Sequence, residues 1–130
     1  MEKQAIIPDK LPSWVKEMTL PLSPAIKAGG FVFVSGYSGF RDRETGAPIE
    51  GIEAQMRETL EVIKDTLEAA GSSLDKVVKA TVFLKNAQDF PRMNQVYHTF
   101  FPKDPPARTT LVTGLVLPEI LVEIECMAMV

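Results

Sequence analysis

Charged side chains interrupt two apolar stretches near the C-terminus of the sequence. Residues 105–112 read PPARTTLV and residues 121–126 read LVEIEC, and their β-branched and apolar residues predict two strands. Arg108 lies in the first stretch and Glu123 in the second, and Thr110 shares a strand face with Arg108 because side chains alternate. A charge among leucine, valine and isoleucine costs free energy unless it is solvated, paired or used. Arg108 and Glu123 are therefore the residues whose chemistry needs an explanation.

Two kinds of chemistry would explain this arginine and this glutamate. As neighbours in a sheet they would form a cross-strand ion pair, which contributes roughly a few tenths of a kcal/mol. As a site, the planar guanidinium would hold a carboxylate through two hydrogen bonds, and the glutamate would position a water and relay its proton. An imine next to a carboxylate suits such a site, because its carbon is already electrophilic and its hydrolysis needs little more from a protein. The spacing of the two residues alone favours the ion pair.

Composition and charge narrow the classes of function. The chain has 130 residues, which fits a single domain over residues 1–130 with a substantial core. A net charge of −3 and an apolar fraction of 45% give no basic patch of the kind that binds nucleic acid. The one cysteine, Cys126, excludes an internal disulfide and fits a reducing compartment, and no apolar run is long enough to cross a membrane. We expect a cytoplasmic protein with neither a nucleic-acid nor a membrane partner.

Familiar catalytic motifs are missing from the sequence. His98 is the only histidine, and it falls on a predicted helix, where we expect it to be exposed. One histidine and one distant cysteine make neither a metal cluster nor a Cys–His dyad. The glycine-rich phosphate motifs are absent, and Ser35-Gly36 has no histidine in pattern that would activate the serine. If the protein is an enzyme, we expect it to work without a metal, a cofactor or a covalent nucleophile.

Hydrophobic periodicity predicts the elements that must position these residues. Between residues 51 and 70, apolar residues recur every three or four positions, which predicts a helix that Gly71 ends. A second helix is predicted from Asp89, its N-cap, to the residues before Pro102. Besides the two stretches above, we expect strands at residues 4–7, 31–36 and 77–84, and a hairpin-type loop at Thr45-Gly46 that leads back through residues 47–49.

The resulting order of elements, β-β-α-β-α-β-β, predicts an α+β fold in which two helices pack on one face of a mixed sheet. The residues before Gly29-Gly30 contain several prolines and are expected to stay extended or turning, with Trp14 at the edge of a core or an interface. Gly36 and Gly39 in a strand context predict a bulge or a close backbone approach. Much of the second sheet face is apolar too, so we expect it to be buried against other copies of the chain.

A series of short motifs runs through nearly the whole chain. They are Phe33-Val34-Ser35-Gly36, Glu68-Ala69-Ala70-Gly71, Thr81-Val82-Phe83-Leu84-Lys85, Asp89-Phe90 with Met93-Asn94, Tyr97 and Phe100-Phe101, and finally Pro106-Ala107-Arg108-Thr109 with Val122-Glu123-Ile124-Glu125. In this order and spacing the series resembles the RidA/YjgF family of imine and enamine deaminases. The resemblance implies a chorismate-mutase-like α+β fold and a homotrimer with an active site in each cleft between subunits. It also implies a small imine or enamine acid, such as 2-iminopropanoate, as substrate, and no cofactor.

The resemblance further implies roles for single residues. Arg108 matches the arginine that binds the substrate carboxylate, and Glu123 matches the glutamate that positions the water. Ser35, Gly36 and Asn94 match positions that line the cleft and come from the neighbouring subunit.

Three cleft positions depart from the best-studied deaminases of the family. Leu22 stands where those proteins have tyrosine, Tyr37 where they have glutamine after Ser-Gly, and Thr110 where they have cysteine. We expect these residues to reshape the cleft for a more extended or more apolar imine or enamine acid. The sequence Arg-Thr-Thr also resembles the 2-aminomuconate deaminase branch, which acts in the degradation of aromatic compounds.

A second class of function stays open beside the deaminase. A non-catalytic member of the family would keep the cleft to bind a small carboxylate, or would act as a chaperone-like or translation-associated protein. Ribonuclease activity, which has been described for some relatives, is disfavoured by the negative net charge and by the lack of a histidine or lysine cluster. Release of ammonia or an oxo acid from a freshly generated imine would separate these classes.

Overall fold

The computed structural model describes residues 2–12, 15 and 19–130 of the chain. In this part, six strands form one sheet: β1 (Gln4–Ile6), β2 (Ala25–Ala28), β3 (Phe31–Tyr37), β4 (Val77–Leu84), β5 (Ala107–Val112) and β6 (Val122–Met129). The helical elements are α2 (Ile52–Ala69), α3 (Phe90–Phe100) and the short 3-10 turns η1 (Leu74–Lys76) and η2 (Ala87–Asp89). Trp14 lies outside the described residues, so its expected place at a core edge or an interface stays a prediction.

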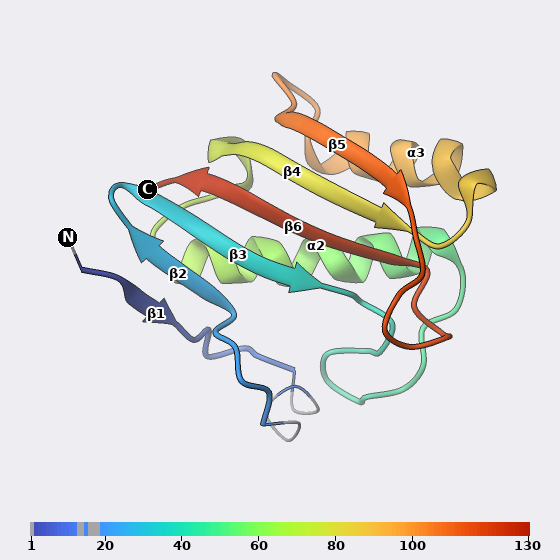
Figure 1. The fold of residues 1–130 in the computed structure, drawn as a ribbon, viewed down its shortest axis with the longest axis horizontal. Coiled ribbons are helices and arrows are strands. Elements are labelled where there is room, and N and C mark those ends of the chain that lie inside the picture. The colour runs from blue at the N-terminus through green and yellow to red at the C-terminus, as the bar shows by residue number, and fades with distance from the viewer. Residues whose placement is uncertain (1, 13–14, 16–18) are drawn as a thin grey trace.

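The sheet is mixed, and α2 and α3 both lie behind it in the view of Figure 1. The strand order is β1-β2-β3-β6-β4-β5, in which β4 and β5 run parallel and all other neighbours run antiparallel. A parallel pair cannot be joined by a tight turn, and α3 supplies the crossover between β4 and β5. The α+β fold with two helices on one face of a mixed sheet is therefore confirmed. Among the described residues, no helix combines the length and the hydropathy that crossing a membrane requires.

The end of α2 and the start of α3 lie where the sequence predicts them. Gly71 directly follows the C-cap of α2 and has a φ of 82°, a conformation that glycine adopts without steric cost. α3 begins after Asp89 with Pro91 in its first turn, although the Asp89 side chain makes no capping hydrogen bond.

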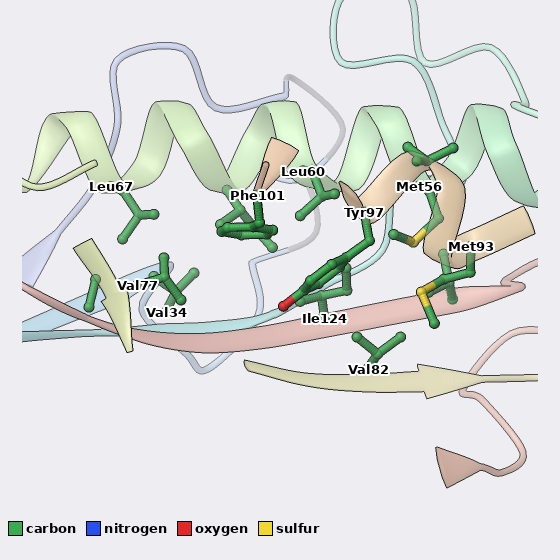
Figure 2. Close-up of a cluster of buried hydrophobic side chains, with 14 of the residues drawn as sticks. Val34, Met56, Leu60, Leu67, Val77, Val82, Met93, Tyr97, Phe101 and Ile124 are labelled. Atoms are coloured by element: carbon green, nitrogen blue, oxygen red, sulfur yellow. The ribbon is translucent and has the colours of Figure 1, made fainter. Parts of the chain in front are cut away.

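The core lies between the sheet and the two helices (Figure 2). The predicted apolar stripe of α2 is buried along the length of the helix. α3 adds Met93 and Tyr97, which Figure 2 shows above Val82 of β4 and Ile124 of β6. Fully burying an apolar side chain of this size contributes about 1.5–3 kcal/mol. This packing fixes α3 against the sheet, and Arg108 of β5 lies beneath that helix.

The hairpin of β2 and β3 is the part of the sheet that the sequence analysis missed. Ala28 pairs with Phe31 across a two-residue turn, in which Gly29 and Gly30 have φ values of 58° and 82°. A turn with positive φ at both central residues suits the twist of a hairpin and favours glycine at both positions. Two adjacent glycines in front of a clear strand are the signal that predicts such a hairpin.

β3 carries the predicted irregularity near its end. Its register with β6 shifts between Val34 and Tyr37, which places a bulge at Ser35-Gly36. The loop that follows leads back as expected but forms no strand, because the return consists of an isolated bridge between Arg41 and Pro48. Two hydrogen bonds flank this bridge, from the Asp42 N–H to the Ala47 carbonyl at 2.8 Å and from the Ile49 N–H to the Phe40 carbonyl at 2.9 Å.

The strands of Arg108 and Glu123 are not neighbours, which corrects one expectation. β4 lies between them: Ala80 stands opposite Arg108 of β5. On its other side, Phe83 stands opposite Glu123 of β6. Consecutive strands often pair, but here β5 returns beside β4 through the α3 crossover and takes the edge, which leaves the central position to β6. A cross-strand ion pair of adjacent strands is therefore excluded as the role of Arg108 and Glu123.

The second face of the sheet, toward the viewer in Figure 1, carries exposed apolar side chains. Because Val32 and Val34 are buried in the core, alternation along β3 puts Phe31 and Phe33 on the second face. Large apolar residues exposed there are Phe31, Phe33, Leu111 and Met129. Grouped apolar residues on a surface are typical of an interaction site.

Candidate active site

Arg108 points to the helix-covered side of the sheet, beneath α3. Its Nη1 lies 3.9 Å from Met93 Sδ, and its guanidinium carbon lies 4.6 Å from the centre of the Tyr97 ring and 5.8 Å from that of Phe90. Ring faces and a thioether hold the side chain in place without neutralising its charge. Within the described part of the chain, neither of the ion pairs involves Arg108. Apart from the Nη1 donor directed at Met93 Sδ, its N–H donors have no acceptor among the described residues and are available to an external anion.

A surface hollow opens beside this guanidinium. Its lining consists of Asn94, Tyr97, His98, Phe101, Pro105, Pro106 and Arg108. The Asn94 amide adds uncharged N–H donors to those of Arg108. Burial raises the pKa of Tyr97 to about 12, against the opposing effect of Arg108, so the phenol is neutral near pH 7 and does not compete for the guanidinium. The hollow is thus suited to an anion of small size.

His98 is exposed, as predicted, but its position at this hollow was not predicted. It stands four residues after Asn94 on α3, and residues at this spacing face the same way on a helix. The four-residue spacing from Asn94 is the signal in the sequence that predicts His98 on the same side of the helix.

Thr110 lies on the same face as Arg108, two residues along β5, but is not among the residues that line the hollow. Its hydroxyl oxygen and that of Tyr97 are buried and have no hydrogen-bond partner among the described residues. Buried hydroxyl groups in proteins normally have such a partner.

Glu123 points to the opposite, open side of the sheet, because it alternates with Val122 and Ile124 of the core. One carboxylate oxygen accepts a hydrogen bond from the buried Ser38 hydroxyl at 3.3 Å. The other lies against Gly36, at which a Cβ atom would collide with the carboxylate. The absence of a side chain at position 36 therefore lets Glu123 occupy this place.

Contacts with α2 hold the segment that carries Ser38. The Gly39 N–H donates to Thr59 Oγ1 at 2.8 Å, and the Thr59 hydroxyl donates to the Gln55 carbonyl at 2.6 Å. A Cβ atom on Gly39 would meet the α2 backbone, so the chain passes directly against the helix. The Gln55 side chain also accepts from the Leu121 N–H at 2.9 Å, just before β6 begins. These buried polar residues fix both the carboxylate and its hydroxyl donor, and the sequence analysis missed them.

Leu22, Ser35, Gly36 and Tyr37 meet at a second hollow, between the N-terminal segment, β3 and α2. All four were expected to line a cleft, and the structure brings them together. Burial, with a smaller contribution from Glu58, raises the pKa of Tyr37, so its phenol is neutral at physiological pH. The hollow lies on the helix-covered side of the sheet, because α2 forms part of its wall, whereas the Glu123 carboxylate lies against Gly36 on the open side.

The expected site residues therefore form two separate groups on one chain. Arg108 and Asn94 belong to the first group, and Glu123 belongs with Gly36 to the second, while the Ser35 hydroxyl donates to the Ser23 carbonyl. The resemblance implied that Asn94, like Ser35 and Gly36, comes to Arg108 from the neighbouring subunit, whereas Asn94 and Arg108 of one chain line the same hollow. Two strand spacings of about 4.8 Å and the sheet itself separate the groups. One small molecule cannot contact Arg108 and Glu123 of the same chain.

The two groups differ in what they can do chemically. Arg108 and Asn94 offer N–H donors, which suit a carboxylate. Glu123 offers an acceptor that can orient a water and take its proton. Among the described residues, no three histidine, cysteine or acidic side chains are placed to hold a metal ion.

Comparisons with known proteins find relatives along the whole chain. The family described as Endoribonuclease L-PSP matches residues 16–130. A RutC family protein of Pyrococcus abyssi is 40% identical over 129 residues, which is 98% of each chain. The 3-aminoacrylate deaminase RutC of Acinetobacter baylyi is 38% identical over 128 residues, again 98% of each chain. Among solved structures, RidA from the Antarctic bacterium Psychrobacter sp. PAMC 21119 has a TM-score of 0.87 at 36% identity, over 98% of this chain and 99% of that one.

Proposed function

The chain belongs to the Endoribonuclease L-PSP family, also known as RidA/YjgF, and from this membership and the geometry above we propose that it is an imine or enamine deaminase. The observation that carries the proposal is Arg108, whose guanidinium is held by ring faces, without a carboxylate partner among the described residues, at a hollow that also holds an amide. A relative named as a 3-aminoacrylate deaminase supports an enamine acid as the class of substrate.

In the proposed reaction, Arg108 binds the substrate carboxylate through two hydrogen bonds and so fixes the imine carbon. An enamine substrate first takes a proton on carbon and becomes the imine. Glu123 accepts a proton from water as the water oxygen bonds to the imine carbon, and the imine nitrogen gains a proton. The amine nitrogen of this tetrahedral adduct then takes the proton held by Glu123, the carbon–nitrogen bond breaks to release ammonia, and Glu123 accepts the hydroxyl proton as the carbonyl of the oxo acid forms. Positioned acid–base groups of this kind contribute about 10²–10⁴ in rate.

We further propose that the site forms between copies of the chain in a homotrimer. Arg108 and Asn94 of one copy would face Glu123 and Gly36 of the next, because the two groups on one chain cannot reach the same molecule. The exposed apolar side chains of the open sheet face give the copies a surface to bury. A closed ring of copies uses the same interface three times and satisfies every site.

The activity is tested with imine acids generated in situ from alanine, leucine and phenylalanine by an amino-acid oxidase, and with 3-aminoacrylate. The expected result is faster loss of the imine, with equal amounts of oxo acid and ammonia, than in the same mixture with an unrelated protein. Rates equal to the spontaneous rate for all four substrates would contradict the proposal.

The shared site is tested by co-expressing the variants Arg108→Ala and Glu123→Gln. Each alone should be nearly inactive, and both should have the mass of three 14.4 kDa chains by light scattering. If Arg108 and Glu123 come from different copies, random mixing restores both residues in about a quarter of the sites. Recovery of roughly that share of wild-type activity supports the proposal. A monomer at micromolar concentration, or no recovery in the mixed trimer, refutes the shared site.

The same assay separates the alternatives. A non-catalytic member would bind 2-oxobutyrate at Arg108 but leave every imine at its spontaneous rate. A 2-aminomuconate-deaminase-like enzyme would act on that dicarboxylic enamine in preference to small imines. The family description names an endoribonuclease, but a net charge of −3 gives no electrostatic support for RNA as the substrate.

A further inference from the structure

Two contacts orient the Glu123 carboxylate. One oxygen accepts the hydrogen bond from the Ser38 hydroxyl at 3.3 Å, and the other lies against Gly36. Ser38 is 7% exposed, and among the described residues this is the one hydrogen bond that its hydroxyl makes. A carboxylate that takes a proton from water must lie within hydrogen-bond reach of that water, so the orientation of the carboxylate decides whether the water is activated.

The residue after Ser38 is attached to α2. The Gly39 N–H donates to Thr59 Oγ1 at 2.8 Å, and a Cβ atom at position 39 would lie 2.5 Å from the Thr59 backbone nitrogen. Thr59 is fully buried, and its hydroxyl donates in turn to the Gln55 carbonyl at 2.6 Å, so its oxygen is left to accept from Gly39. A path of contacts therefore runs from Thr59 through the Gly39 segment to the Glu123 carboxylate.

The attachment of this segment to α2 does not depend on Thr59 alone. Arg43 forms ion pairs with Glu58 at 3.2 Å and with Asp65 at 2.9 Å, and its backbone N–H donates to the Glu58 carboxylate at 2.9 Å. These contacts keep the segment on the helix when the Thr59 hydroxyl is removed. What that hydroxyl adds is the position of Gly39 and of the serine before it.

We propose that Ser38 and Thr59 are positioning residues for the reaction, which act on it only through the Glu123 carboxylate. The inference rests on the proposed function, in which Glu123 takes the proton from water. Displacing a reacting group by about 1 Å costs up to about a hundredfold in rate. Loss of either hydroxyl should therefore lower kcat by about ten- to a hundredfold and leave KM unchanged, because carboxylate binding at Arg108 remains.

The test compares Thr59→Val with a matched control, Thr66→Val. Thr66 lies on the same buried face of α2, is 4% exposed, and donates its hydroxyl to the Val62 carbonyl at 2.9 Å, as Thr59 does to Gln55. Valine has nearly the shape of threonine, so both variants lose the same kind of bond within the helix, but only Thr59→Val releases the Gly39 N–H. Thr59→Val should lower kcat by about ten- to a hundredfold, and Thr66→Val should keep wild-type kcat.

Ser38→Ala tests the other end of the path without changing α2, so it decides the question if Thr59→Val does not fold. It should lower kcat by the same order. Thr59→Ser keeps the hydroxyl and should keep wild-type kcat. In the Glu123→Gln background, neither Ser38→Ala nor Thr59→Val should lower kcat further, because the group that they position is gone.

The carbon-13 NMR signal of the Glu123 carboxyl group, assigned by its absence from Glu123→Gln, gives a readout that needs no turnover. It should move in Ser38→Ala and Thr59→Val and stay in place in Thr66→Val. Wild-type kcat in the first two variants, or equal losses in Thr59→Val and Thr66→Val, would overturn the positioning roles while leaving the deaminase proposal intact. If the wild type hydrolyses no imine, the proposed function fails. A signal that then moves as expected still supports the hold on the carboxylate, and one that stays in place in all variants overturns it.

Discussion

Replacing Arg108 with alanine is expected to lower kcat/KM for imine acids by about 10²–10³, which corresponds to roughly 3–4 kcal/mol of transition-state stabilisation. The guanidinium lies at a hollow with an amide and has no carboxylate partner among the described residues, so the substrate carboxylate would be its counter-charge. Without the Arg108 guanidinium, the substrate carboxylate would lose its hydration in a site that offers only the Asn94 amide. The measurement is steady-state kinetics with the imine that the wild type prefers.

Two controls separate this role from a structural one. Arg108→Lys keeps a charge but loses the planar pair of donors, so it should recover only a small part of the activity. The contacts of Arg108 with the Tyr97 and Phe90 rings are worth about 0.5–1 kcal/mol each at exposed sites, so Arg108→Ala should keep its trimeric mass and unfold only slightly earlier. An alanine variant with wild-type kinetics, or one that no longer assembles, would show that Arg108 serves the fold instead.

The elements with strong periodicity could be predicted from the sequence. The α2 stripe repeats over five turns, and β4 is a long apolar run, so local pattern and final burial agree. β2 was missed because Ala25–Ala28 is short and contains two alanines, which have low strand propensity. The pairing of β6 with β4 rather than β5 depends on where the α3 crossover places β5, and no local pattern contains that information.

The candidate site was predicted as a set of residues but not as an arrangement. Arg108 and Glu123 were recognisable because each is a charge inside an apolar strand. Their placement on opposite sheet faces follows from strand order and register, which the sequence pattern does not specify. Ser38, Gln55 and Thr59 were missed because a polar residue on a buried helix face or in a loop looks like any other until its partners are known.

Under the proposed function, this arrangement makes assembly a condition for chemistry. On a single chain the donors of Arg108 and the acceptor of Glu123 lie on different sides of the sheet, so each chain would carry two halves of the proposed site. An apolar sheet face that must be buried and half-sites that must be completed would then be satisfied by the same association. Dilution below the dissociation constant of the assembly should therefore abolish activity and not merely reduce the stability of the protein.

Replacing Glu123 with glutamine is expected to lower kcat by about 10²–10⁴, with KM nearly unchanged, because the group that takes the proton from water is lost while carboxylate binding at Arg108 remains. Glutamine has almost the same shape, and its amide oxygen can still accept from the Ser38 hydroxyl, so the fold around Gly36 is retained. Glu125 provides a matched control: it lies on the same sheet face two residues further along β6, and it is exposed. Glu125→Gln should keep wild-type kcat. Equal losses in the two variants would mean that the negative charge of this face matters rather than a proton acceptor at position 123, and a Glu123→Gln enzyme with normal kcat would remove Glu123 from the reaction.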